Sequence, residues 1–105
     1  MEIEDLQEEF KLFLEEQKWL EFTPSEVFTH LIEELGELAK HILFRTGYKT
    51  ESIGHRKTPS EELKKEFGDI FSLFLHLCIL FDINLEEIWA DYFPSLKKRF
   101  DAKTK

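Results

Sequence analysis

Apolar side chains recur every three or four residues along most of this chain, which is the spacing of amphipathic helices. The first such stretch covers residues 3–21, and its apolar members share one side of a helix: Ile3, Leu6, Phe10, Phe13, Leu14 and Leu20. Three more stretches follow, from residue 24 to about Phe44, from 59 to about Phe81, and from about Asn84 towards Phe100. No segment alternates with period two between turn signals, so we predict no strands.

Helix start signals support three of these boundaries. The letters TPSE occur at Thr23–Glu26 and again at Thr58–Glu61. In each, Thr is suited to the N-cap, Pro to the first helical position, and Glu to closing a capping box. Asn84 and Glu87 form a similar pair, and Pro94 is expected to kink or divide the last helix.

Four helices with short connections predict an all-α fold, a four-helix bundle formed by one domain over residues 1–105. The third helix is apolar nearly all round beyond Asp69, where only Ser72 and His76 interrupt it. A helix that is apolar on every side must be buried on every side. Three partner helices cover it only in part, so we predict completion by homo-oligomerisation, as a homodimer or a dimer of dimers.

Composition and charge limit the kinds of partner and the cellular compartment that we expect for this protein. The formal charge of −8, from 22 acidic and 14 basic residues, repels a nucleic-acid backbone, so we expect no nucleic-acid partner. The acidic N-terminal stretch is unlike a secretory signal, and no apolar run is long enough to span a bilayer. The single cysteine, Cys78, cannot form an internal disulfide, which fits a reducing compartment. These features predict a cytoplasmic protein without a membrane partner.

Two pairs of acidic residues stand at the edges of apolar faces. At about 100° per residue, His30, Glu34, Glu37 and His41 form one polar stripe beside the apolar face of the second helix, whereas Glu33 points outward. Glu66 and Asp69 lie one turn apart on the third helix and share a face with Leu73 and Leu80. Acids on a face that continues as core are costly unless they are paired or bind metal. Two such pairs on facing helices predict four carboxylates around divalent metal, and oxygen donors favour Mg²⁺ or Mn²⁺ over Zn²⁺.

A structural role competes with this hypothesis. In so acidic a chain either spacing arises often by chance, and each pair taken alone is better explained as solvated helix surface. Their joint occurrence beside apolar faces on adjacent helices favours the metal site. A di-iron site would require Glu-x-x-His motifs, and none occurs.

The runs EELGEL at Glu33–Leu38 and EFGDIF at Glu66–Phe71 resemble the MazG-like nucleotide pyrophosphohydrolases of the all-alpha NTP pyrophosphatase superfamily. The signature of that family is ExxE, a spacer, and ExxD. DINLEEIW at Asp82–Trp89 is similar to the family's turn into its last helix. The resemblance covers most of the chain, although only the two acidic motifs are specific.

This resemblance implies a Mg²⁺-dependent enzyme that hydrolyses nucleoside triphosphates (NTPs or dNTPs) to monophosphate and pyrophosphate. It implies that Glu34, Glu37, Glu66 and Asp69 are the catalytic metal ligands, with Mn²⁺ as the alternative ion. One of them, or the adjacent Glu33, is the candidate general base.

The last helix departs from the family pattern. Aligned through LEEI, Tyr92 and Leu96 stand where the family has a phosphate-binding Lys and Asn, and only Arg99 matches. The basic loop after the second helix offers other candidates for substrate phosphate, namely Lys49, Arg56 and Lys57.

Two alternatives remain beside the pyrophosphohydrolase. The changed last helix favours a non-catalytic helical module that oligomerises and binds nucleotide or a protein partner. The second alternative is phosphoribosyl-ATP pyrophosphohydrolase, which shares the superfamily that the chain resembles, although the sequence around the acids is more similar to the MazG branch.

Overall fold

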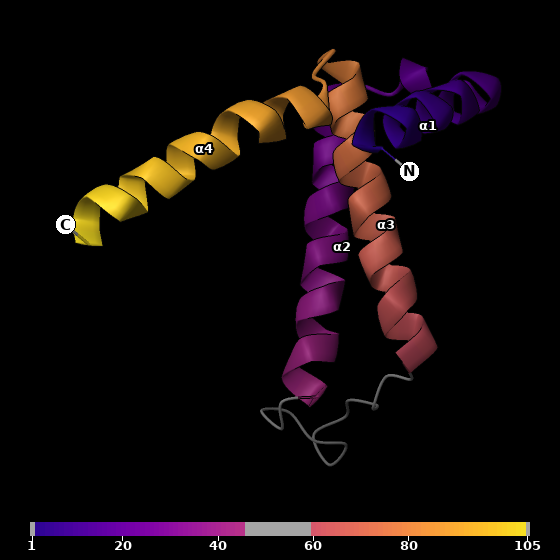
Figure 1. Cartoon of the computed structure of the whole chain (residues 1–105). Helices are drawn as coiled ribbons and strands as arrows, with labels where there is room; N and C mark the ends of the chain where they lie inside the picture. The colour runs from indigo at the N-terminus through magenta and orange to yellow at the C-terminus, as the bar shows by residue number, and fades with distance from the viewer. Residues whose placement is uncertain (1, 46–59, 105) are drawn as a thin grey trace. The chain divides into compact units, whose positions relative to one another are not determined.

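The computed structural model describes residues 2–45 and 60–104, and these form four α-helices, one 3₁₀ helix and no strand. The helices are α1 (Ile3–Gln17), α2 (Pro24–Arg45), α3 (Ser60–Leu80) and α4 (Leu85–Thr104), with the 3₁₀ helix η1 at Trp19–Glu21 (Figure 1). The prediction of an all-α fold is therefore confirmed. None of these helices taken singly is long and apolar enough to cross a membrane; only Glu62–Leu80 and Leu85–Asp101 taken together reach that length and composition.

The predicted start of α2 is confirmed at atomic level. The backbone N–H of Thr23 donates to Glu26 Oε1 at 3.0 Å, and the N–H of Glu26 donates to Thr23 Oγ1 at 3.2 Å. These two bonds form the capping box that the sequence indicated, and they lower the pKa of Glu26 because they favour its charged form. The corresponding cap at Thr58 lies outside the described residues.

The chain divides into two compact units, and each is described by itself. The first contains residues 1–21 and 78–105, and the second contains residues 22–77. The second unit carries the acidic motifs, on α2 and on the part of α3 up to Leu77.

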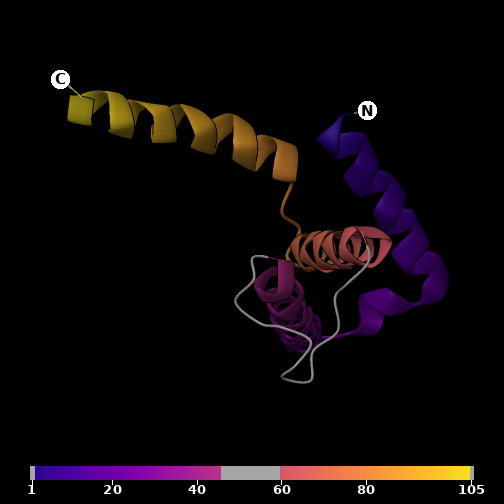
Figure 2. The same cartoon turned by 90° about the horizontal axis from the view of Figure 1, so that it is seen from below.

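In the second unit, α2 and α3 run antiparallel and lie side by side in both views (Figure 1, Figure 2). Val27, Leu31 and Leu38 are buried on α2, and Leu75 is buried on α3. On a helical wheel Leu35 and Ile42 fall on the apolar face of α2 with Leu31 and Leu38, yet both are more than 40% exposed. The apolar face of α2 is therefore wider than the part that the chain itself covers.

In the first unit, α1 ends four residues earlier than the periodicity predicted. Lys18 adopts a left-handed conformation, with φ of 62°, and its N–H bonds to the carbonyls of Leu14 and Glu15. This turn stops the α-helix, and the ring of Trp19 returns edge-on to Phe13 with centroids 5.6 Å apart. The predicted single helix over residues 3–21 is thus α1 followed by η1.

The turn between α3 and α4 follows a common helix-ending motif. Asp82 has a φ of 56°, and the N–H of Ile83 donates to the carbonyl of Cys78 at 2.9 Å. The side chain of Gln7 fastens this turn to α1, since its Nε2 donates to the Ile83 carbonyl and its Oε1 accepts from the N–H of Leu85. The N–H of Glu87 donates to Asn84 Oδ1 at 3.1 Å, which confirms Asn84 as the cap of α4.

The prediction was that Pro94 kinks or divides the last helix. α4 continues through Pro94, so the helix is not divided there. A proline inside a helix removes one backbone hydrogen bond and crowds the preceding turn, at a cost of about 3 kcal/mol or more.

Candidate metal centre

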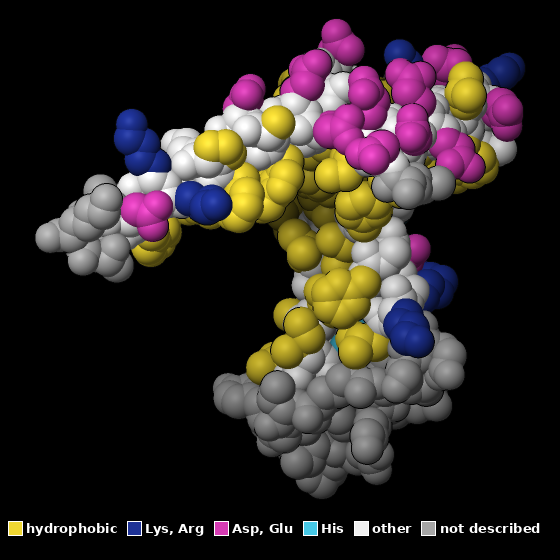
Figure 3. Space-filling model, viewed as in Figure 1, with side chains coloured by type: hydrophobic (Ala, Val, Ile, Leu, Met, Phe, Trp, Pro, Cys, Tyr) yellow, Lys and Arg dark blue, Asp and Glu magenta, His cyan; other side chains and the backbone are white. Residues whose placement is uncertain are grey.

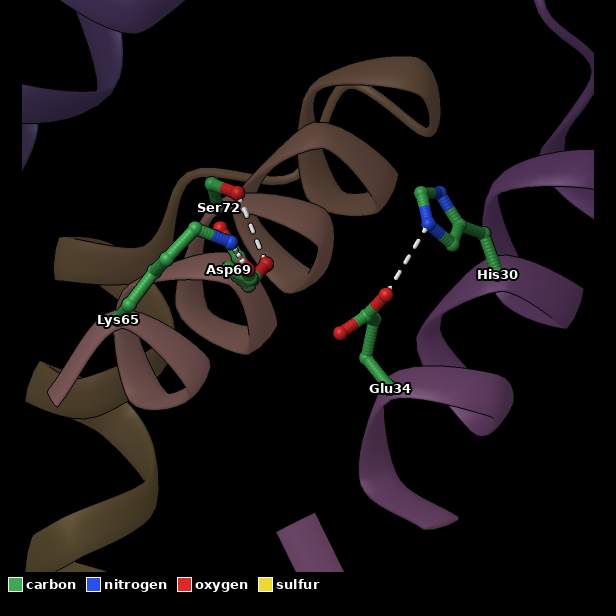
Figure 4. Close-up of polar contacts among 5 residues, drawn as sticks. All are labelled: His30, Glu34, Lys65, Asp69 and Ser72. Atoms are coloured by element: carbon green, nitrogen blue, oxygen red, sulfur yellow. Dashed lines mark hydrogen bonds and ion pairs between the residues drawn. The ribbon is translucent and has the colours of Figure 1, made fainter. Parts of the chain in front are cut away.

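Three of the predicted acids converge between α2 and α3. Glu34 comes from the middle of α2, and Glu66 and Asp69 come from the first half of α3. One carboxylate oxygen of each lies within 4.8 Å of the others, and all three residues are partly buried. Because the helices are antiparallel, the middle of α2 faces this part of α3. Figure 4 shows the Glu34 carboxylate directed towards α3.

Glu66 differs from the other two acids because one of its carboxylate oxygens is buried and its pKa is raised. Its Oε2 is buried and has no hydrogen-bond partner among the residues that the structure describes. The pKa of Glu66 is raised, chiefly because burial disfavours the charged form, and further by proton sharing with Glu34 and by the charges of Glu34 and Asp69. A smaller, opposite effect comes from His41. In the described part of the chain, the buried Oε2 of Glu66 therefore meets no hydrogen-bond donor.

The outer members of the group have polar neighbours (Figure 4). Lys65 Nζ lies 2.9 Å from Asp69 Oδ2, one turn earlier on the same helix. The Ser72 hydroxyl donates to the backbone carbonyl of Asp69 at 2.8 Å, and His30 Nε2 lies 3.4 Å from Glu34 Oε1. Asp69 and Glu34 therefore have counter-groups at the rim, whereas the buried oxygen of Glu66 has none.

A divalent cation fits this donor set. Mg²⁺ binds oxygen at about 2.0–2.1 Å, so two opposite ligands of one ion stand about 4.2 Å apart. The separation of up to 4.8 Å among these oxygens needs only a small side-chain movement to reach that value. Bound there, an ion would supply the charge that the orphaned Glu66 oxygen lacks.

Glu37 and Glu33 lie outside this group of three. The side chain of Glu37 is half exposed, and its Oε2 lies 3.6 Å from Lys40 Nζ. Glu33 is exposed on α2, as the helical wheel predicted. The roles of Glu37 as a ligand and of Glu33 as general base stay predictions.

The predicted substrate-binding residues are not brought to the group by any described contact. Arg99 lies exposed on α4, in the first unit. Lys49, Arg56 and Lys57 lie outside the described residues. Lys65, by contrast, is a basic residue at the carboxylates that the sequence pattern did not single out. Its position four residues before Asp69 was the available signal, since residues at that spacing meet on a helix surface.

Comparisons with known proteins agree with this picture. No family model matches the chain. The chain is 29% identical to the uncharacterized protein YvdC of Bacillus subtilis over 104 residues, which is 96% of this chain and 98% of YvdC. It is 33% identical to YpjD of the same organism over 85 residues, which is 81% of this chain and 74% of YpjD. The chain belongs to the YpjD family.

A crystal structure of a YpjD family member shares the fold. The Bacillus subtilis protein, described as "the putative pyrophosphatase YPJD", matches with a TM-score of 0.76 at 27% identity, over 90% of this chain and 94% of the other. The likeness therefore extends over nearly the whole of both chains.

Proposed function

We propose that this protein is a Mg²⁺-dependent nucleoside triphosphate pyrophosphohydrolase of the MazG-like type. The observation that carries the proposal is the group formed by Glu34, Glu66 and Asp69, with a buried, unpaired Glu66 oxygen at its centre. Membership of the YpjD family supports it, because the crystal structure of YpjD carries a pyrophosphatase description. Glu37 is proposed as a fourth ligand from α2, one turn beyond Glu34.

The proposed reaction hydrolyses the bond between the α- and β-phosphates. A water oxygen forms a bond to the α-phosphorus, the bridging bond to the β-phosphate breaks, and the products are nucleoside monophosphate and pyrophosphate. Mg²⁺, when bound, lowers the pKa of a coordinated water and offsets the charge of the phosphates. Glu34, Glu66 and Asp69 would hold the ion, and one of these acids, Glu37 or the exposed Glu33 would accept the proton that the water loses.

The test is a substrate panel with purified protein in Mg²⁺ and in EDTA. The panel contains the common NTPs and dNTPs together with inorganic pyrophosphate. We expect at least one nucleotide to yield monophosphate and pyrophosphate in Mg²⁺ and none in EDTA. Release of phosphate from inorganic pyrophosphate alone would make the protein an inorganic pyrophosphatase instead. Failure across the whole panel, with ion binding demonstrated, would contradict the enzymatic proposal.

A non-catalytic module that binds nucleotide is the second candidate. Tyr92 and Leu96 favour it, because they stand where the similar enzymes carry phosphate-binding side chains. Such a module would bind a nucleotide in the presence of Mg²⁺ without consuming it. Binding measured by calorimetry, alongside product analysis of the same sample, separates the two functions.

We also propose that the protein self-associates through an apolar surface on α2 and α3. This surface, the α2/α3 face, consists of side chains between 42% and 54% exposed: Phe28, Ile32, Leu35 and Ile42 on α2, with Phe67, Phe71 and Phe74 on α3. Figure 3 shows apolar side chains gathered along this side of the two helices. At about 100 Å² for each half-exposed large side chain, the face offers roughly 700 Å² per copy, close to the 800 Å² or so of a stable interface.

The α2/α3 face leaves the carboxylates accessible. Ile32 and Glu34 are two residues apart, as are Phe71 and Asp69, and two residues turn a helix by about 200°. Ile32 and Phe71 therefore point away from Glu34 and Asp69, whereas Phe67 lies only about 100° from Glu66. Light scattering should give at least twice the monomer mass, and the double variant Ile32→Glu and Phe71→Glu should give the monomer mass. A wild-type monomer, or an oligomer that survives both substitutions, would contradict the proposal.

A further inference from the structure

Lys65 is a basic side chain at the carboxylate group. Its Nζ lies 2.9 Å from Asp69 Oδ2 (Figure 4), and the side chain as a whole is 73% exposed. The charges of Asp69, Glu66 and Glu34 all raise the pKa of Lys65, with Asp69 contributing most. The ammonium therefore lies in the combined field of the three acids that the proposed function assigns to Mg²⁺.

This ion pair contributes little to the stability of α3. An exposed pair on a helix surface is worth little, and a Lys that precedes its acid by four residues has the less favourable orientation relative to the helix dipole. The position of the Lys65–Asp69 ion pair matters more than its strength, because Asp69 is also one of the three proposed metal ligands. A divalent ion and an ammonium at that carboxylate repel each other, so the two compete for Asp69.

The side chain of Lys65 can move away from Asp69 at little cost. It is a flexible four-carbon stem with a compact charge, and most of it is already in water. Once released from Asp69, the ammonium stays within one helical turn of the group, next to the position of a phosphate chain held there. The family positions expected to bind phosphate are Tyr92 and Leu96 in this chain, and neither side chain carries a positive charge.

We propose that Lys65 is the internal counter-ion of the carboxylate group, that it leaves Asp69 when a divalent cation binds, and that it then binds a phosphate group of the substrate. The second half of this proposal rests on the proposed function, whereas the first half depends only on binding of the ion. Lys65 thereby provides positive charge in both states of the site.

The first test uses Mn²⁺ alone, titrated calorimetrically into the wild type, Lys65→Gln and Lys64→Gln. Lys64 is the matched control, because it makes the same charge change on the same helix but points about 100° away. We expect Lys65→Gln to bind Mn²⁺ about five- to tenfold more tightly than the wild type, since the competing cation is gone. Lys64→Gln should stay within about twofold of the wild type, because its charge is farther away and screened. Equal affinities for the two variants would overturn the counter-ion role.

The second test measures KM and kcat for the nucleotide that the panel identifies. We expect Lys65→Gln to raise KM about tenfold with a smaller effect on kcat, and Lys65→Arg to restore most of the affinity because it keeps the charge. An unchanged KM in Lys65→Gln would overturn the phosphate role. If no nucleotide is hydrolysed, the same comparison is made on the affinity for a nucleoside triphosphate in Mn²⁺. Failure of the proposed function is therefore distinguishable from failure of the role of Lys65.

Discussion

Among the residues that the structure describes, two groups of carboxylates each contain one glutamate whose pKa is raised, by similar causes. Glu66 has Glu34 and Asp69 as neighbours, on α2 and α3. Glu86 has Glu2 and Glu4 as neighbours, at the starts of α4 and α1. For both, desolvation is the largest cause and the neighbouring acids add to it.

The two groups differ in what surrounds the acids. Glu86 lies in the first turn of α4, where free backbone N–H groups favour negative charge. Its neighbour Glu4 accepts a hydrogen bond from Asn84 Nδ2 at 3.3 Å. Glu66 lies beyond the first turn of α3, and its buried Oε2 has no donor. Clustering of acids is therefore common to both groups, while a buried oxygen without a partner distinguishes the one that we assign to metal.

The largest expected difference between the groups is in catalysis. Glu66→Gln should lower kcat by about 100-fold or more, equivalent to roughly 3 kcal/mol of transition-state stabilisation, because it removes a charged ligand at the centre of the group. Glu86→Gln makes the same chemical change in the other group and should leave kcat within about twofold. Steady-state assays of pyrophosphate release measure both. Equal losses would mean that the comparison does not identify the active group.

The pH dependence of folding stability, measured in EDTA to remove bound metal, gives a second comparison of Glu66 with Glu86. A raised pKa in the folded state means that Glu66 favours folding below the ordinary pKa of Glu, and that this contribution is lost as pH rises through the raised value. Gln stays neutral, so Glu66→Gln should match the wild type in acid and become the more stable of the two as pH rises towards neutrality. Glu86→Gln should show the same direction with a smaller amplitude, because Glu86 lies at a helix start beside water. Thermal unfolding across this pH range gives both curves; a Glu66→Gln protein that is less stable than the wild type at neutral pH would contradict the account.

The smallest expected effect is on folding stability, when Asn84, which donates a hydrogen bond to Glu4 of the Glu86 group, is replaced. Asn84→Ala removes the cap of α4 and the hydrogen bond to Glu4, and should cost about 1 kcal/mol of unfolding free energy. Affinity for Mn²⁺ should not change, because the substitution leaves Glu34, Glu66 and Asp69 as they are. Denaturant unfolding combined with a Mn²⁺ titration checks both statements, and a loss of ion affinity would link the two groups.

Local features were predictable from the sequence because they depend on few neighbouring residues. The capping box at Thr23 and Glu26 and the cap at Asn84 formed as expected. The end of α1 was not predicted, because the apolar spacing continues to Leu20 and a left-handed Lys18 leaves no mark in that pattern. The left-handed residue that ends a helix is usually glycine, so a glycine would have predicted this turn and a lysine does not.

The sequence pointed to the acids of the candidate site. It did not show which of them converge or which basic residue lies beside them. Spacing alone placed Glu34, Glu66 and Asp69 at the edges of apolar faces. Which of the four acids converge depends on how α2 lies against α3, and a single helical wheel does not contain that information. Lys65 was missed for a related reason: a pattern of acids beside apolar neighbours gives no weight to basic residues along the same face. Likewise, Leu31 and Leu35 are equally apolar in the sequence, but the chain buries only Leu31.

The most direct test of the central claim is a calorimetric titration of Mn²⁺, without nucleotide, into the wild type, Glu66→Gln and Glu86→Gln. The account predicts a saturable site in the wild type, the same site in Glu86→Gln, and an affinity at least tenfold weaker in Glu66→Gln, since a charged ligand is lost. Equal affinity in all three proteins, or no binding to the wild type, would contradict the assignment of Glu34, Glu66 and Asp69 as a metal centre.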